Sequence, residues 1–237
     1  MFLKNSIALI VLLGATSQLI AAEPPRPWKA EAELGIVATS GNTETTSVKA
    51  HAGVVHEQGK WRHTGKVDAL NTSDATRTTG ERYALSGKSD YKFDARSYVF
   101  GLVSYENDRF AGFDYRMSET LGYGYRVISQ DTLTLDLEAG PGARQTQLRN
   151  SSSENEFMGY IGGKLLWKFS PSASLSEDLT MEIGSDTTIT RSVTALTAQL
   201  VGSLAMKLSF TARHISEVPA SVKDLDTETA MTLVYGF

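Results

Sequence analysis

The C-terminal end of the chain alternates between two kinds of side chain. Apolar or aromatic residues occupy every second position: Met231, Leu233, Tyr235 and Phe237. A period of two places these residues on one face of a β-strand. A final strand that keeps an aromatic face up to its last residue is typical of the closing strand of a transmembrane β-barrel, whereas the termini of soluble domains are usually frayed and polar.

The same alternation recurs along the chain. In the clearest case, Tyr83 and Tyr91 oppose Lys88. The segments with this pattern are 28–39, 45–56, 61–69, 82–93, 98–106, 115–127, 132–140, 156–169, 174–183, 191–201, 204–215 and 227–237. Most exceed the roughly 5–6 residues common in soluble sheets and match the ~9–11 residues of a tilted membrane strand. We expect an all-β fold, an antiparallel up-and-down transmembrane β-barrel of about twelve strands. The register of 189–201 stays open because this region is apolar on both faces.

Two kinds of connection alternate between these segments. Short turns are expected at 57–60, 94–97, 128–131, 170–173 and 202–203. Longer polar connections are expected at 72–80, 107–114, 141–155, 184–190 and 216–226, and only the first of this second set, 40–44, is short. Tight turns on one rim and long loops on the other are typical of outer-membrane barrels, which carry the turns on the periplasmic side.

The N-terminus has the pattern of a secretory signal peptide. An apolar run at 7–13 follows Lys4, and small residues precede Glu23. We therefore expect a removable leader at 1–22 and a barrel domain at 23–237. The alternative, a membrane-anchoring helix, is disfavoured because the run is shorter than the ~20 residues that a span needs. The chain has no cysteine, so disulfides cannot stabilise the exported domain.

Composition and motifs argue against an enzyme. The formal net charge is −4, and a mildly acidic chain with interspersed charges gives no reason to expect nucleic acid as a partner. The sequence lacks a Gly-x-Ser-x-Gly elbow and a His-Glu-x-x-His pair. Gly122-Tyr123-Gly124 lies in a strand pattern without the third glycine of a nucleotide loop, and glycine there more often admits a neighbouring side chain. We expect no cofactor, no metal and no catalytic residue.

Two local groups leave other chemistry open. His214 lies near Ser216 and Glu217, a combination that hydrolases build on barrel walls, although this spacing alone does not establish a nucleophile and a base. The alternating acidic residues near the last connection are Asp224, Asp226 and Glu228. They have the oxygen ligands that a divalent cation prefers, and a solvated acidic loop is the simpler interpretation.

The polar faces of the segments predict a charged lumen. Basic residues dominate this face between 45 and 93, and acidic residues dominate it in 132–140 and 174–183, roughly opposite in a ring of twelve. The residues expected to line the lumen are Lys49, Arg62, Lys66, Asp68, Arg82, Lys88, Asp90, Asp136, Glu138, Asp178 and Glu182. Opposed walls of opposite charge would set up a transverse field across an aqueous channel. In the alternative, which Lys164 and Lys168 favour, these charges pair across the lumen and close it.

Aromatic residues gather beside the rim of tight turns. The expected girdle and C-terminal signal are Trp28, Trp61, Trp167, Tyr235 and Phe237, with Phe93, Tyr98, Tyr125 and Phe169 beside them. Such rings favour the headgroup zone of a membrane. A soluble β-sandwich would instead spread its aromatic residues along the strands. Glu119 and Glu177 also fall on the lipid face, which is costly away from the interface.

Several motifs resemble those of one family of bacterial outer-membrane barrels. They are Glu33-Leu34-Gly35 with Ser40-Gly41-Asn42-Thr43, Tyr105-Glu106 with Asp108-Arg109-Phe110, Gly112 and Asp114-Tyr115-Arg116, Gly122-Tyr123-Gly124-Tyr125-Arg126, and Glu138-Ala139-Gly140-Pro141-Gly142. The chain thereby resembles the YdiY-like family, usually described as salt-induced outer membrane proteins, from about residue 30 to its end. The resemblance implies an outer-membrane barrel associated with salt or envelope stress, and it assigns no catalytic residue.

Together these patterns predict a non-enzymatic, monomeric barrel in the cell outer membrane. Its expected partners are outer-membrane lipids, lipopolysaccharide and, through the C-terminal strand, the barrel-assembly machinery. Its expected role is a small-solute channel with a charged lumen or, alternatively, a closed structural component of the envelope. A soluble periplasmic β-protein and an outer-membrane hydrolase are the less favoured alternatives.

Overall fold

A computed structural model describes most of the chain. The described residues are 27–40, 46–73, 78–108, 113–149, 153–218 and 223–237. The predicted signal peptide 1–22 lies outside these ranges. Within them, no helix has the length and apolar character that crossing a membrane requires.

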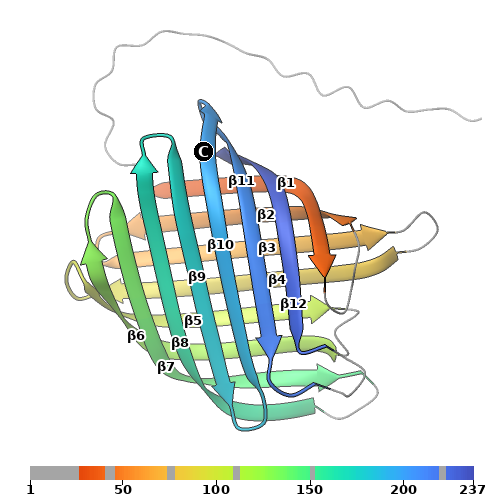
Figure 1. Cartoon of the computed structure of the whole chain (residues 1–237). Coiled ribbons are helices and arrows are strands. Elements are labelled where there is room, and N and C mark those ends of the chain that lie inside the picture. The colour runs from red at the N-terminus through yellow and green to blue at the C-terminus, as the bar shows by residue number, and fades with distance from the viewer. Residues whose placement is uncertain (1–26, 41–45, 74–77, 109–112, 150–152, 219–222) are drawn as a thin grey trace, which may run out of the picture.

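Twelve antiparallel strands close into a single barrel (Figure 1). They are β1 (Trp28–Ser40), β2 (Thr46–Gln58), β3 (Trp61–Ser73), β4 (Thr78–Lys92), β5 (Ser97–Asp108), β6 (Phe113–Ser129), β7 (Leu133–Leu148), β8 (Ser153–Ser170), β9 (Ala173–Gly184), β10 (Thr188–Val201), β11 (Leu204–Ile215) and β12 (Leu225–Gly236). Each strand pairs with its neighbours in sequence, and β1 pairs with β12 to close the ring. The predicted fold class, an up-and-down barrel of about twelve strands, is confirmed.

The two faces of the wall have opposite chemistry. On β1, Leu34 and Ile36 are exposed on the outer surface, whereas Glu33, next to Leu34, is buried inside. The interior also holds Asp90 and Glu138, each almost inaccessible to solvent. Apolar residues outside and charged residues inside are the arrangement of a membrane barrel and the reverse of a soluble sandwich.

The connections are shorter than the sequence pattern predicts. The prediction of a long polar connection at 141–155 is wrong, because β7 continues to Leu148 and β8 begins at Ser153. The one expected at 184–190 is likewise shorter, since β10 begins at Thr188. At 144–147 and 153–156 polar residues face both sides of the wall, so the alternation disappears while β7 and β8 stay paired. Of the connections predicted to be long, only that between β11 and β12 keeps nearly its expected length.

The region of open register, 189–201, forms most of β10. It pairs without interruption with β9, and its ladder with β11 shifts once, between Gln199 and Val201. A bulge at this end, close to the turn at Gly202, lets β10 keep one inward face, which includes the buried Ala195.

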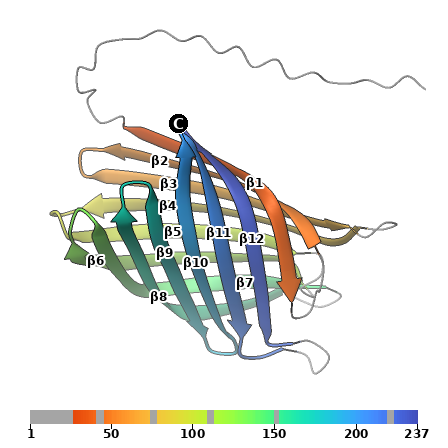
Figure 2. The ribbon, with the colours of Figure 1, turned by 45° about the horizontal axis from the view of Figure 1, so that its top comes forward.

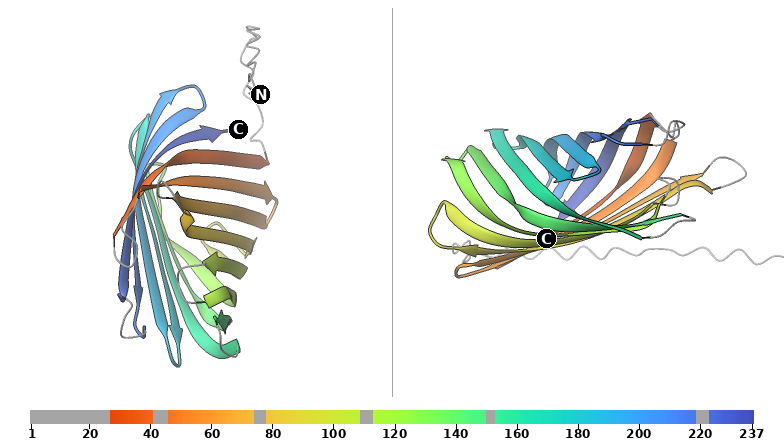
Figure 3. Two further views of the ribbon diagram at one scale, coloured as in Figure 1. Left: turned by 90° about the vertical axis from the view of Figure 1, so that its right-hand side faces the viewer. Right: turned by 90° about the horizontal axis from the view of Figure 1, so that it is seen from below.

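The barrel has two facing walls. Figure 1 shows β9–β12 in front, running across the direction of β1–β5 behind them, and Figure 2 shows the same crossing after a turn about the horizontal axis. Figure 3 shows the walls from the side and from below. Side chains of opposite walls touch, as Lys66 on β3 and Asp178 on β9 do at 3.9 Å. The walls are therefore close enough for side chains to fill much of the space between them.

Candidate functional site

The middle of the lumen is charged and accessible. The Nζ of Lys66 lies 3.9 Å from Asp178 Oδ2 across the barrel, and these side chains are 44% and 34% exposed. Lys164 is the cross-strand partner of Asp178 on β8, and Arg191 on β10 is exposed. All four side chains lie at inward positions of their strands, and the barrel is closed. Their solvent-accessible surface therefore faces the lumen.

In the half of the lumen nearer to the longer connections, ion pairs join strands of opposite walls. Arg213 on β11 donates to both carboxylate oxygens of Glu106 on β5, at 2.8 and 3.1 Å. Glu228 on β12 accepts from Lys49 at 2.6 Å and from Arg82 at 2.8 Å. These contacts tie β2, β4 and β5 to β11 and β12, and they narrow this half of the barrel.

Three aromatic rings fill the other half beside β5 to β8. Tyr98, Phe100 and Tyr160 form a buried cluster, and the rings of Phe100 and Tyr160 meet edge to face at 5.8 Å. The hydroxyl of Tyr98 donates to Glu138 at 2.7 Å. Lys88 pairs with Glu138 and lies over the Phe100 ring, 4.5 Å from its centroid. Apolar packing and buried ion pairs thus form a plug that we call the aromatic cluster.

Glycines on the barrel wall make room for this cluster. A Cβ at Gly124 would lie 2.2 Å from Tyr98 Cζ, and one at Gly122 would lie 2.5 Å from Phe100 Cζ. Neither glycine has the positive φ that would make backbone conformation the reason. The motif Gly122-Tyr123-Gly124 therefore admits the neighbouring rings, and the structure offers no nucleotide loop there.

The predicted lumen residues all have inward positions in the strands, and most form ion pairs. Arg62 pairs with Asp90 at 2.6 Å, Arg126 with Asp136 at 2.7 Å, and His51 with Asp68 at 2.9 Å. The structure adds lumen residues that the sequence reasoning missed: Tyr98, Phe100, Glu106, Arg144, Tyr160 and Arg213. Each lies at an inward position of its strand, so the alternation could have found them, but the prediction covered only charged residues within 45–93, 132–140 and 174–183.

The predicted girdle residues lie on the outer surface at the rim of tight turns. Those named as girdle and C-terminal signal are all exposed: Trp28, Trp61, Trp167, Tyr235 and Phe237. Trp61 stacks on His63 at 5.6 Å, and a shallow groove there is lined by His56, Gln58, Trp61 and His63. The placement of Tyr98 among these aromatics is wrong, because Tyr98 is the second residue of β5 and points inward to Glu138.

The two acidic residues expected on the lipid face lie on the outer surface. Glu119 alternates with the buried Ser118 and Thr120 and is exposed. Glu177 is next to the inward-facing Asp178, and it accepts hydrogen bonds from the hydroxyls of Ser192 and Thr194 on β10. Hydroxyl donors on the same face satisfy this carboxylate and lower the cost of its exposure to lipid.

The candidate hydrolase residues and the candidate cation-binding residues do not come together in the structure. His214 faces Asp224 at 3.6 Å, whereas the hydroxyl of Ser216 accepts the backbone N–H of Thr188 at 2.9 Å. Among the described residues no hydrogen bond joins His214 to Ser216, so the arrangement of nucleophile and base that the spacing left open is not formed. The acidic residues Asp224, Asp226 and Glu228 also separate, because Glu228 lies inside the barrel between Lys49 and Arg82.

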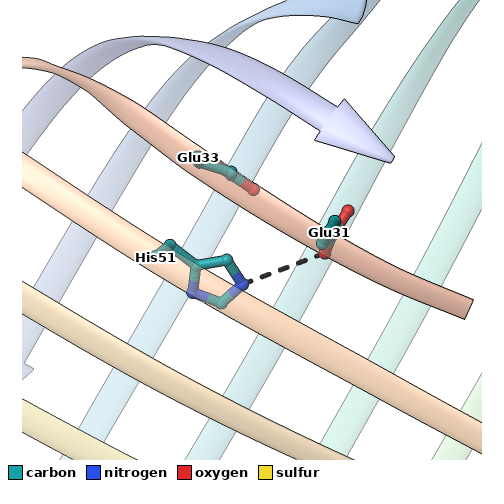
Figure 4. A group of neighbouring side chains, drawn as sticks. All are labelled: Glu31, Glu33 and His51. Atoms are coloured by element: carbon teal, nitrogen blue, oxygen red, sulfur yellow. Dashed lines mark ion pairs between the residues drawn. The ribbon is translucent and has the colours of Figure 1, made fainter. Parts of the chain in front are cut away.

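One group of described side chains has the composition of a metal site. Glu31 and Glu33 on β1 and His51 on β2 point toward one another inside the lumen (Figure 4). Glu33 accepts from Lys207 at 2.7 Å and from Thr232 at 3.1 Å. This group lies one inward position closer to the rim of tight turns than Lys49, which pairs with Glu228.

Comparison with known sequences gives one family. Residues 32–237 match the model described as "Protein of unknown function, DUF481". The "Uncharacterized protein YdiY" of Escherichia coli (strain K12) is 28% identical over 217 residues, which cover 90% of this chain and 85% of that protein.

Comparison with solved structures gives the fold of outer-membrane channels. The NanC porin superposes with a TM-score of 0.59 and 9% identity over 86% of this chain and 98% of that one. The KdgM porin in complex with disordered oligogalacturonate gives 0.51 and 11% over 87% and 99%. The COG4313 outer membrane channel from Pseudomonas putida F1 gives 0.53 and 10% over 93% and 100%. At these identities the likeness concerns the fold alone.

Proposed function

Because this chain belongs to the DUF481 family, whose function is unknown, we propose its role from the lumen itself: a narrow channel for small hydrophilic solutes across the bacterial outer membrane. The resemblance in fold to small-solute channels supports this proposal. The channel has no catalytic step, and its residues act by charge and by shape.

The observation that carries the proposal is the accessible charge in mid-barrel. Lys66 and Asp178 are partly exposed although the ring around them is closed. A polar solute that enters the lumen loses part of its hydration shell. Charged walls reduce this desolvation cost because they offer ionic and hydrogen-bonding contacts in its place. Opposite charges on facing walls favour solutes that carry both donors and acceptors.

A closed envelope barrel is the second candidate, and a specific observation favours it. The aromatic cluster with Lys88 and Glu138 fills the lumen beside β5 to β8, and the pair of Arg213 and Glu106 crosses its other half. Small barrels commonly fill their interior with side chains in this way. The two candidates differ in whether a continuous wet path runs past these obstacles.

The proposed location and partners follow from the outer surface. Export through the signal peptide and assembly through the C-terminal strand would place the apolar band in the outer membrane as a monomer. The girdle at the rim of tight turns would then contact phospholipid headgroups, and the opposite rim would contact lipopolysaccharide. Fractionation of cells and heat-modifiable migration of the unboiled protein test this placement; a protein found in the soluble periplasm would contradict it.

An association with salt or envelope stress is proposed from the family resemblance alone. It predicts more of this protein per cell at high salt than at low salt, measured by quantitative immunoblotting. Equal amounts under both conditions would contradict the association and leave the channel proposal intact.

Swelling of proteoliposomes tests solute passage. Vesicles that contain the refolded barrel should swell in small uncharged sugars and swell progressively less as sugar size increases, because ion pairs narrow the lumen. Empty vesicles serve as the control. Inserted barrels that admit no sugar at any size would favour the closed barrel.

A further inference from the structure

Three potential metal ligands come together on the inner wall of β1 and β2. Glu33 lies directly opposite His51 in the ladder, and Glu31 lies two residues further along the same face. One ligand atom of each side chain lies within 4.8 Å of the other two. Figure 4 shows the three side chains directed to the same space. Two carboxylates and an imidazole are a donor set that Zn²⁺ and related divalent ions accept.

Asp68 on β3 fixes the orientation of His51. Its Oδ1 lies 2.9 Å from Nδ1 of the imidazole, so the other ring nitrogen, Nε2, faces Glu31 Oε1 at 3.8 Å. A histidine that gives one ring N–H to a carboxylate and turns its other nitrogen to a shared space has the arrangement found around metal-binding histidines. Asp68 is therefore a positioning residue for His51.

A missing side chain leaves space beside the ligand atoms. Gly53 is the cross-strand partner of Glu31, and a Cβ built on it would lie 3.1 Å from Glu31 Oε1 and 3.3 Å from His51 Nε2. The Glu31 side chain is 49% exposed. The space is thus bordered by two ligand atoms and open to solvent in the lumen.

The local charge also favours a cation. Three carboxylates, those of Glu31, Glu33 and Asp68, surround His51. Lys207 pairs with Glu33, and the neighbouring cations Lys49 and Lys66 pair with Glu228 and Asp178. Among the described residues His51 is the ion-pair partner of both Glu31 and Asp68, so a neutral His51, the form that binds a metal, would leave these two carboxylates without one. We propose that Glu31, Glu33 and His51 bind one divalent transition-metal ion of the Zn²⁺ class inside the barrel.

This proposal does not depend on transport. An open channel and a closed barrel with access from one rim both expose Glu31, so a failure of either proposal leaves the other testable. The competing explanation of the group is a set of ion pairs made by a protonated His51, and it predicts no specific metal binding.

Calorimetric titration of the refolded full-length mature barrel with Zn²⁺ tests the site. We expect one ion per chain, and His51→Asn and Glu31→Gln should each weaken binding at least about tenfold. Asp68→Asn should weaken it roughly 10- to 100-fold, as loss of an orienting carboxylate does elsewhere. His63→Asn is the matched control, because His63 lies on the outer surface against Trp61, and it should bind as the unmodified protein does.

The controls keep the test decisive. Heat-modifiable migration shows that each variant has folded, and Glu31→Gln carries the test if His51→Asn does not fold, because Glu31 is half exposed. Absence of Zn²⁺ binding would overturn the proposal. Unchanged binding in Glu31→Gln, or loss of binding in His63→Asn, would overturn it as well.

Discussion

Arg213 and Glu106 lie on opposite walls of the barrel and still form a two-point ion pair, with N–O distances of 2.8 and 3.1 Å. Their strands, β11 and β5, are six positions apart in a ring of twelve. With strands about 4.8 Å apart, a round ring would be roughly 20 Å across, too wide for these two side chains to meet. Their contact therefore requires a flattened cross-section, and it makes the width of the lumen depend on side chains.

Removal of one charge from this pair should destabilise the barrel. Arg213→Gln leaves Glu106 in a confined site without its partner, and we expect a loss of about 1–3 kcal/mol, less than for a fully buried pair because both side chains retain some solvent contact. Urea unfolding of the refolded protein measures this. Arg191→Gln is the matched control, since Arg191 is exposed and makes no ion pair within the described part of the chain. Equal losses in both variants would contradict the assignment.

Removal of an aromatic ring should widen the lumen. Phe100 is buried between Tyr160 and Lys88, so Phe100→Ala opens space in the aromatic cluster and should raise single-channel conductance. Phe210→Ala is the control, because Phe210 is exposed on the outer surface. A conductance that does not change in Phe100→Ala would mean that the solute path avoids the cluster.

The glycines beside the cluster should tolerate no side chain. Gly124→Ala places a Cβ against Tyr98 and should cost about 1–3 kcal/mol of stability, as overpacking does. A Cβ at Gly87 meets nothing within 4 Å, so Gly87→Ala should change stability by less than about 0.5 kcal/mol. Thermal shifts of band migration compare the two variants. Similar shifts would show that the close approach to Tyr98 is not what requires glycine.

The turn between β4 and β5 should respond to acid. Asp94 accepts the backbone N–H groups of Arg96 and Ser97 at 2.7 and 2.8 Å, and these bonds hold the pKa of its carboxyl below the usual 3.8. The ionised form is the one that the fold favours, so this contribution is complete above pH 3.8 and is lost as the pH falls through the lowered value. Asp94→Ala should be less stable than the unmodified protein at neutral pH, and the difference should shrink in acid. A difference that stays constant with pH would contradict this role.

The alternation of residues predicts most of the architecture for a physical reason. A strand with lipid on one side and a charged lumen on the other must alternate, so Leu34 and Glu33 reveal their faces without a structure. The lengths of the connections could not be found in this way. Beyond the apolar band both faces of a strand are polar, and a strand such as β7 near Leu148 looks like a loop.

The sequence predicts which residues line the lumen, but it does not predict which of them contact one another. Position along the strand shows that Lys66 and Asp178 face inward, but no sequence rule says that Lys66 Nζ and Asp178 Oδ2 come within 3.9 Å across the lumen. Of the aromatic cluster, Tyr98 is expected from the sequence in the girdle, and Phe100 and Tyr160 carry no expectation because the predicted lumen consists of charged residues. Tyr98 differs from Phe93 in pointing inward, toward Glu138, and only the alternation within 97–108 separates the two.

Single-channel conductance of the refolded mature protein in a planar bilayer tests the central claim most directly. The proposed channel predicts discrete, reproducible steps, and Lys66→Glu or Asp136→Lys should change the ion selectivity of these steps. Barrels that insert, migrate as folded protein on unboiled gels and give no conductance would contradict the channel and identify the protein as a closed barrel.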